Sequence, residues 1–349
     1  MDTSVMITLG FLVFAIVMFA WEKIPLSITA MVVAVGLHLS GVLSAKEAFA
    51  GFVDPNVLLF MGMFVIGEAF FATGVAVGVG NVVHKFAKTE TSLLVAVMMI
   101  TGILSGFLSN TGTAAVLIPV IIGICKKSGF KQTKLLMPLV FAAAMGGNIS
   151  LIGAPGNMIA QAGLQQAGLG SFGFFDYGLV GLPILIVGTI FYATIGKRFL
   201  PDAPSHQPDG AFEGNDDYSH VPSWKKWTAA IVLILTVVAM IFEKQLGVKL
   251  YVSAWVGALV LVATNVISET AAVKSIDMKT IMLFAGSMAL GDAMVKTGTG
   301  SVIADIIVNS LGASPSPIVV LVVIFVLGVF MTNFMSNTAT CALLVPIGL

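Results

Sequence analysis

Long apolar runs separated by short polar segments extend over almost the whole chain. Each run approaches the roughly 20 residues that a helix needs to cross a bilayer, so the pattern predicts membrane-spanning helices. The predicted spans are residues 5–21, 24–43, 56–83, 133–168, 177–196, 227–242, 250–267 and 280–311. Glycines and a proline interrupt the span 133–168, which therefore predicts a discontinuous helix. The expected fold class is an all-α polytopic membrane protein.

The apolar stretch 91–125 fits neither one crossing nor two. As one straight helix it would be about 52 Å long, whereas the apolar core of a bilayer is about 30 Å thick. As two crossings, the part after residue 113 would be too short. Lysines flank the stretch on both sides, which places both of its ends in the same compartment. We therefore expect a re-entrant hairpin whose tip is Ser109–Thr113.

The distribution of basic residues orients the chain. If the hairpin 91–125 opens to the cytoplasm, most lysines and the single arginine, Arg198, also fall on that side. The polar segment 200–225 is rich in Pro, Asp, Gly and Ser and predicts a flexible cytoplasmic linker. The expected location is the cell (inner or plasma) membrane, which the chain crosses many times.

Two halves of the chain share a series of matching positions in the same order. The tripeptide Ser-Asn-Thr occurs at 109–111 and at 336–338, each time inside an apolar stretch. Further matches pair Gly67-Glu68-Ala69 with Gly291-Asp292-Ala293, and Thr73-Gly74 with Thr297-Gly298. An odd number of crossings in each repeat makes the second repeat inverted. The first repeat covers 1–199, with the hairpin 91–125 and the broken helix 133–168. The second covers 226–349, has a hairpin from about 315, and is expected to be incomplete.

Composition narrows the class of function. Apolar residues make up 58% of the chain and charged residues 10%, with a mean hydropathy of +1.03, whereas roughly a quarter of a soluble domain is charged. The formal net charge is zero, so no nucleic-acid partner is expected. The two cysteines and four histidines show no metal-ligand spacing, and no nucleophile–base pair is evident. We therefore expect neither an enzyme nor an organic cofactor.

The two tripeptides place hydroxyl and amide groups at lipid depth, where such groups are costly unless they bind something or pair within the protein. One interpretation is that the serine only caps the following half-helix. The other is a transport site, in which freed carbonyls and side-chain oxygens bind Na⁺ and a half-helix N-terminus binds an anion. A cap and a ligand site are compatible, and the duplication favours a binding role.

The paired tripeptides, with Gly-Gly-x-x-Ser-x-Ile-Gly-x-Pro-x-Asn at 146–157, resemble the divalent anion:sodium symporters of the ion transporter superfamily. The resemblance implies an inverted-repeat homodimer in the bilayer that moves a di- or tricarboxylate or sulfate with Na⁺ by an elevator-type movement. It implies Na⁺ ligands from both tips and the broken helix: Ser105, Ser109, Asn110, Gly153, Thr332 and Asn337. The implied substrate contacts are Asn110, Thr111, Asn157, Asn337 and Thr338.

Two repeat-equivalent acids, Glu68 and Asp292, lie well inside predicted spans, where a carboxylate is costly and functional by default. They leave open a proton-coupled anion carrier or antiporter, or an arsenite-type exporter of the same superfamily. Alternatively, the two carboxyl groups have only a structural role and form hydrogen bonds where helices pack together. An inactive truncated subunit is the remaining alternative.

Overall fold

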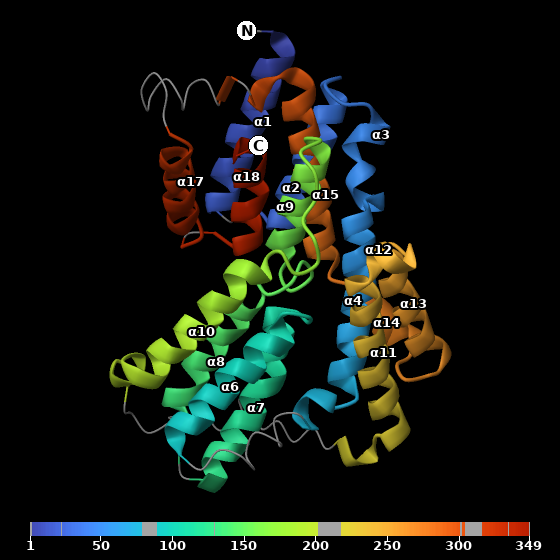
Figure 1. Cartoon of the computed structure of the whole chain (residues 1–349). Coiled ribbons are helices and arrows are strands. Elements are labelled where there is room, and N and C mark those ends of the chain that lie inside the picture. The colour runs from blue at the N-terminus through green and yellow to red at the C-terminus, as the bar shows by residue number, and fades with distance from the viewer. Residues whose placement is uncertain are drawn as a thin grey trace. The chain divides into compact units, whose positions relative to one another are not determined.

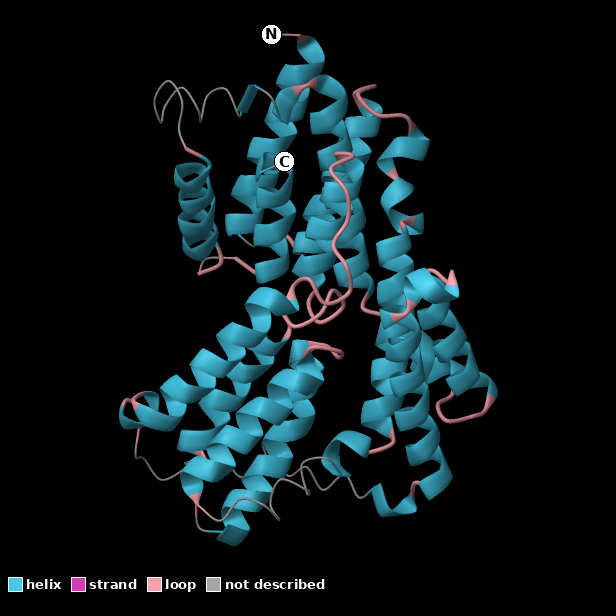
Figure 2. Ribbon diagram, viewed as in Figure 1, coloured by secondary structure: helices cyan, strands magenta, loops and turns pink. Residues whose placement is uncertain are grey.

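The computed structural model describes residues 2–21, 23–78, 89–128, 130–201, 218–300, 302–303, 316–333 and 335–348. All regular structure in these residues is helical (Figure 2), which confirms the all-α class. The chain forms two compact units that interleave in sequence. Unit 1 comprises Met1–Leu58, Pro155–Ser171 and Asp277–Leu349, and unit 2 comprises Leu59–Ala154 and Phe172–Ile276. The repeat boundaries at 199 and 226 rest on sequence correspondence and stay a prediction.

Unit 1 is built around one helix, α15 (Met278–Thr297). The other elements of the unit are α1 (Thr3–Trp21), α2 (Leu26–Leu39), α3 (Ala45–Ala48), η1 (Ala50–Val53), α9 (Pro155–Gln166), α17 (Pro317–Met331) and α18 (Asn337–Gly348). α15 packs against α1, α2, α9 and α18, and its Leu290 and Met294 join one buried apolar cluster. Because lipid is as apolar as a protein core, close van der Waals packing holds such helices together.

Unit 2 contains the first hairpin, formed by α6 and α7, as well as the contacting helices α8 and α10 and the contacting helices α11 and α13 (Figure 1). Its elements are α4 (Pro55–Ala72, from Leu59 on), α6 (Glu90–Ser105), α7 (Asn110–Ser128), α8 (Thr133–Gly146), α10 (Gly178–Thr194), η2 (Gly196–Arg198), η3 (Tyr218–His220), α11 (Ser223–Ile241), α12 (Glu243–Leu246), α13 (Leu250–Ala263) and α14 (Glu269–Ser275). Leucines of α6, α8 and α10, among them Leu93, Leu135 and Leu185, are fully buried where these helices meet. This packing fixes the helix ends that carry the first tip.

Within the described residues, four helices are both long and apolar enough to cross a membrane: α1, α4, α11 and α15. Large apolar side chains are exposed on α1, α10, α11, α13 and α17, as expected for helices that face lipid. Each predicted span contains at least one helix in the described residues, although some spans extend past the helix ends, as 24–43 does beyond Leu39 and 250–267 beyond Ala263. The linker 200–225 lies largely outside the described residues, since 202–217 are not described.

Two predicted spans are interrupted. In the spans 56–83 and 280–311 the helices α4 and α15 end at Ala72 and Thr297, and helical residues resume at 75–78 and at 299–300 and 302–303, while the predicted ends of both spans lie outside the described residues. Gly74 and Gly298 follow with φ of 74° and 72°, a left-handed conformation that ends a helix and that glycine adopts without strain. In both halves the preceding threonine hydroxyl donates to the carbonyl four residues back at 2.7 Å. The matched sequence positions therefore have matched local structure.

The hairpin predicted over 91–125 has the expected form. α6 and α7 meet at the tip, and at the open end the backbone N–H of Lys131 lies 3.4 Å from Glu90 Oε1. The chain therefore returns to the place where it entered. The apolar part of α7, Asn110–Cys125, begins at the tip itself, so this arm is longer than the sequence analysis assumed. At 1.5 Å per residue it measures about 24 Å, which is still short of a full crossing.

The broken helix is also present. α8 ends at Gly146, residues 147–154 are not helical, and α9 begins at Pro155. Proline suits a first helical position because its missing N–H would have had no partner there. The non-helical stretch includes Gly153, whose backbone carbonyl contributes to the candidate site.

Candidate functional site

The first Ser-Asn-Thr tip turns the chain between α6 and α7 in unit 2. α6 ends at Ser105 with Gly106 as its C-cap. Ser109 caps α7, because its hydroxyl accepts the backbone N–H of Gly112 at 3.0 Å. The capping interpretation is therefore correct for the serine, while the neighbouring Asn110 has different partners.

Four oxygen-bearing groups converge beneath the tip. The amide head of Asn110 lies 2.7 Å from Ser105 Oγ, 3.1 Å from the Gly153 carbonyl oxygen and 3.2 Å from the Ala143 carbonyl oxygen. Ser105 is fully buried, and its hydroxyl has two acceptors at 2.7 Å, the Ala143 carbonyl and Asn110 Oδ1. Its single proton serves one of them at a time. We call these groups the oxygen cluster: Ser105 Oγ, the Asn110 amide, the Ala143 carbonyl and the Gly153 carbonyl.

Either end of the Asn110 amide fits the oxygen cluster. With its N–H₂ turned inward, the amide donates to the surrounding oxygens. With Oδ1 turned inward, it accepts the Ser105 hydroxyl and completes a set of four oxygens without formal charge. Such a set suits a hard cation, and carbonyls at broken helices bind Na⁺ in transporters. The residues present therefore fit the ion that the sequence analysis expected.

Close approach of backbone to the amide shapes the oxygen cluster. A Cβ added at Gly147 would lie 2.6 Å from Asn110 Oδ1, and one at Gly153 would lie 2.5 Å from the Gly147 carbonyl oxygen. Neither position has room for a side chain, which explains two of the glycines in the motif. The Ser150 hydroxyl donates to the Gly106 carbonyl, so the unwound segment is fastened to the end of α6.

An aromatic loop packs against the unwound segment and against the residues that precede the tip. The backbone N–H of Leu151 donates to the Phe174 carbonyl at 2.9 Å. The Phe174 ring stacks on Phe107 with centroids 6.5 Å apart, and Phe175 meets the same ring edge-on at 6.2 Å. Thr111 on the first turn of α7 remains exposed, so the helix N-terminus, which favours anions, stays open.

The second tip, in unit 1, repeats these local contacts. The Thr332 hydroxyl donates to Asn337 Oδ1, as Ser105 does to Asn110. Ser336 caps α18 by accepting the Ala339 N–H at 3.1 Å, and Thr338 is half-buried. Unit 1 also contains Asn157, which is buried on α9. Thr332, Asn337 and Thr338 of the second tip thus lie in unit 1, together with Asn157 of the first repeat. The remaining predicted Na⁺ and substrate residues lie in unit 2: Ser105, Ser109, Asn110, Thr111 and Gly153.

The two acids differ in their surroundings. Glu68 lies on α4 between Gly67 and Phe71, which face Leu108 and Gly112 of the first tip. Asp292 is half-buried on α15. Lys296, one turn further along α15, does not serve as its partner, because its Nζ lies 2.9 Å from both carboxylate oxygens of Glu47.

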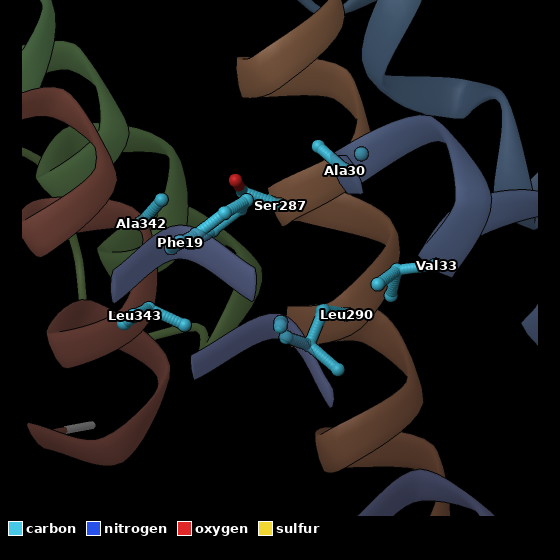
Figure 3. A pocket seen from close by; sticks show the side chains of 9 residues that line it. Phe19, Ala30, Val33, Ser287, Leu290, Ala342 and Leu343 are labelled. Carbon is cyan, nitrogen blue, oxygen red and sulfur yellow. The ribbon is translucent and has the colours of Figure 1, made fainter. Parts of the chain in front are cut away.

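The sequence analysis missed the Ala143 carbonyl and the role of Gly147. Every residue has a backbone carbonyl, so residue type cannot identify this ligand. The position of Ala143 in the last turn of a half-helix could have suggested it, because carbonyls there are available to other donors or to ions. A small apolar cavity in unit 1, between Phe19, Ala30, Leu290 and Leu343 (Figure 3), has a volume of about 10 Å³. It holds at most one water molecule and is too small for a substrate.

Known proteins resemble the chain over most of its length. YfbS, an uncharacterized transporter of Escherichia coli strain K12, is 33% identical over 211 residues, which are 60% of this chain and 35% of YfbS. The chain thus spans about a third of that relative. The sodium-dependent dicarboxylate transporter SdcS of Staphylococcus saprophyticus is 25% identical over 365 residues, 93% of this chain and 69% of SdcS.

The fold also has a counterpart among solved structures. The crystal structure of the YdaH transporter of Alcanivorax borkumensis superposes with a TM-score of 0.59 and covers 99% of this chain and 82% of that chain. Its sequence is 14% identical, so this likeness concerns the fold alone.

A family model described as "Citrate transporter" (CitMHS) matches residues 16–349. The match includes both Ser-Asn-Thr tips, the broken helix and both acids, and it confirms the resemblance found from the sequence. The family and the relatives are transporters and not enzymes. The chain therefore belongs to the citrate transporter family of multi-pass membrane proteins.

Proposed function

We propose that the protein couples Na⁺ to the movement of a small divalent anion, a di- or tricarboxylate or sulfate, across the cell membrane. The proposal includes an elevator-type movement, a homodimer in the bilayer and no organic cofactor. SdcS, a relative over most of the chain, carries the description sodium-dependent dicarboxylate transporter. The geometry of the oxygen cluster in this chain gives a second reason for the proposal.

The oxygen cluster is the single observation that carries the proposal. Its three other groups lie 2.7–3.2 Å from the Asn110 amide head, and the family resemblance implied Ser105 and Gly153 as Na⁺ ligands. The contact between Thr332 and Asn337 repeats half of this arrangement at the second tip. In this proposal Ser109 and Ser336 act first as caps that hold the asparagines in place.

Coupling follows from the two ends of one amide. When a cation occupies the oxygen cluster, Oδ1 of Asn110 turns towards it and the N–H₂ group turns outward. The outward N–H₂, the Thr111 hydroxyl and the N-terminus of α7 then form a donor set for a carboxylate. Without the cation the N–H₂ group donates inward and is lost to the anion. Asn337 and Thr338 supply the equivalent donors at the second tip, with Asn157 as a further contact.

Uptake into proteoliposomes tests the proposal. An inward Na⁺ gradient should drive accumulation of at least one of succinate, citrate and sulfate, and K⁺ or Li⁺ should replace Na⁺ poorly. Uptake of these anions that proceeds equally well on a proton gradient without Na⁺ would refute Na⁺ coupling.

Asn110→Asp separates the two ends of the amide. The carboxylate keeps oxygens for the cation but has no N–H₂ for the anion and adds a repelling charge. Anion transport should be lost while Na⁺ affinity is kept or raised, measured by Na⁺-dependent thermal stabilisation of the purified protein. If the variant transports normally, Asn110 does not donate to the substrate.

A proton-coupled carrier or an arsenite-type exporter is the second candidate. It is favoured by the position of Glu68, which lies on α4 between two residues that face the first tip, and by its repeat-equivalent Asp292. In that case Glu68→Gln and Asp292→Asn should abolish proton-driven transport, and arsenite should be among the transported species. Variants that keep Na⁺-driven uptake of a dicarboxylate would exclude this candidate.

A further inference from the structure

A cavity of about 230 Å³ lies in unit 2, away from the residues of the first tip. It is formed where α6 and α8 begin and where η2 follows α10. Its lining residues are Glu90, Thr91, Leu94, Lys134, Lys197 and Arg198. A cavity needs only about 10–15 Å³ to hold one water molecule, so this one accommodates a group of several atoms.

The charge of the lining favours an anion. Three basic side chains and one carboxylate leave a formal excess of two positive charges. The N-termini of α6 and α8, helices of 16 and 14 residues, add their positive dipole ends to the same region. A phosphate group offsets this excess: inorganic phosphate or a monoester carries a charge of about −1.5 to −2 near pH 7, and the diester of a phospholipid headgroup carries about −1.

Two of the basic side chains, those of Lys197 and Arg198, are placed to bind an anion. Lys197 Nζ donates to Thr91 Oγ1 at 3.0 Å, which holds the ammonium group at the cavity wall. No hydrogen bond or ion pair between described residues engages the Arg198 guanidinium, a planar fork that matches two phosphate oxygens. Glu90 Oε1 accepts the Lys131 backbone N–H at 3.4 Å, so the one carboxylate has a partner within the protein.

The surface next to the cavity is apolar and exposed. Val187 and Ile190 of α10 are 65% and 57% exposed, and Phe199, directly after Arg198, is 79% exposed. An apolar helix face that ends at a basic cavity fits a phospholipid, with acyl chains along α10 and the headgroup phosphate in the cavity. Basic pockets between membrane helices bind acidic lipid headgroups in this way.

We propose that this cavity binds a phosphate group, either of an acidic phospholipid headgroup or of phosphate in solution. The site is separate from the proposed transport site, and its occupation does not depend on Na⁺ or on the transported anion.

The test uses the purified full chain in an uncharged detergent with three probes: inorganic phosphate, phosphatidylglycerol and phosphatidylcholine. Binding is measured by thermal stabilisation and by native mass spectrometry. The double variant Lys197→Gln/Arg198→Gln removes two cavity charges. Lys244→Gln/Lys274→Gln removes the same charge from exposed positions of unit 2 and serves as the matched control. Thr91→Val removes only the acceptor that positions Lys197.

Wild type and control should bind phosphatidylglycerol or phosphate at least tenfold more tightly than the cavity variant, and Thr91→Val should weaken binding about two- to fivefold. Preference for phosphatidylglycerol over both other probes identifies a lipid headgroup as the source. Binding of inorganic phosphate alone identifies a soluble source. The proposal is overturned if neither phosphatidylglycerol nor phosphate binds, or if the cavity and control variants lose the same affinity.

Discussion

Replacing Gly147 by alanine should disable the oxygen cluster without replacing any residue that contributes a group to it. The new Cβ would lie 2.6 Å from Asn110 Oδ1 and 2.8 Å from Nδ2, whereas ordinary contact begins at 3.4 Å. The difference requires the amide head to withdraw by about 0.8 Å, since backbone yields less readily than a side chain. The amide would then no longer bridge Ser105 and the two carbonyls.

The loss of cation affinity can be estimated from the contribution of a hydrogen bond to a charged group, which is roughly 1.5–3 kcal/mol. If the displaced amide contributes that much to cation binding, Na⁺ affinity should fall roughly ten- to hundredfold. The measurement is the Na⁺ concentration for half-maximal uptake, together with melting temperatures in Na⁺ and in K⁺.

Gly123→Ala is the matched control. Gly123 lies inside α7, and a Cβ there meets nothing within 4 Å. Alanine should therefore leave Na⁺ dependence unchanged and stabilise the helix by about 0.5–1 kcal/mol. A folded Gly147→Ala protein with wild-type Na⁺ dependence would refute the reasoning. Should that variant fail to fold, Ser105→Ala removes a hydroxyl without adding atoms and must show the same loss.

Three further outcomes follow from single contacts. Thr111→Val should weaken anion binding by about 1–3 kcal/mol without lowering the melting temperature. A lower melting temperature with unchanged anion binding would mean that the tip only caps α7. The hydrogen bond from Lys296 lowers the pKa of Glu47 to about 2 from 4.5, so this pair stabilises the fold above pH 4.5 and the benefit fades towards pH 2. Melting temperatures of wild type and Glu47→Gln should accordingly converge over that interval, and parallel curves would contradict the assignment. Single cysteines at Ser92 and Lys131 should react with an impermeant reagent from one side of the membrane, and labelling from opposite sides would exclude the hairpin.

The sequence predicted those features that depend on residue type. Apolar runs located the helices, and basic flanks predicted the hairpin, whose ends the structure brings together at Glu90 and Lys131. The sequence comparison identified the matched pairs Thr73-Gly74 and Thr297-Gly298 but did not predict that a helix ends at each of them. An apolar run continues beyond Gly74 and Gly298, and hydropathy does not register a left-handed φ.

Other features lay beyond residue type. The sequence named Ser105, Asn110 and Gly153, but not the Ala143 carbonyl that completes the oxygen cluster, because every residue has a carbonyl. Nor could spacing show that Lys296 pairs with Glu47 rather than with Asp292. The i, i+4 spacing allows Asp292 and Lys296 to pair on one helix. Lys296 pairs with Glu47 of another helix instead, because both carboxylate oxygens of Glu47 lie 2.9 Å from its Nζ.

The residue type at position 110 carries the argument for coupling. An aspartate there would offer only acceptors, and an apolar residue of the same size would offer neither donor nor acceptor. Asparagine alone presents an oxygen and an N–H₂ group on a side chain short enough to fit between Ser105 Oγ and two backbone carbonyls. In the proposed mechanism the amide cannot turn both ends inward, and its orientation therefore links the oxygen cluster to the open end of α7. Asn337 repeats the hydroxyl contact at the second tip, with Thr332 in the place of Ser105.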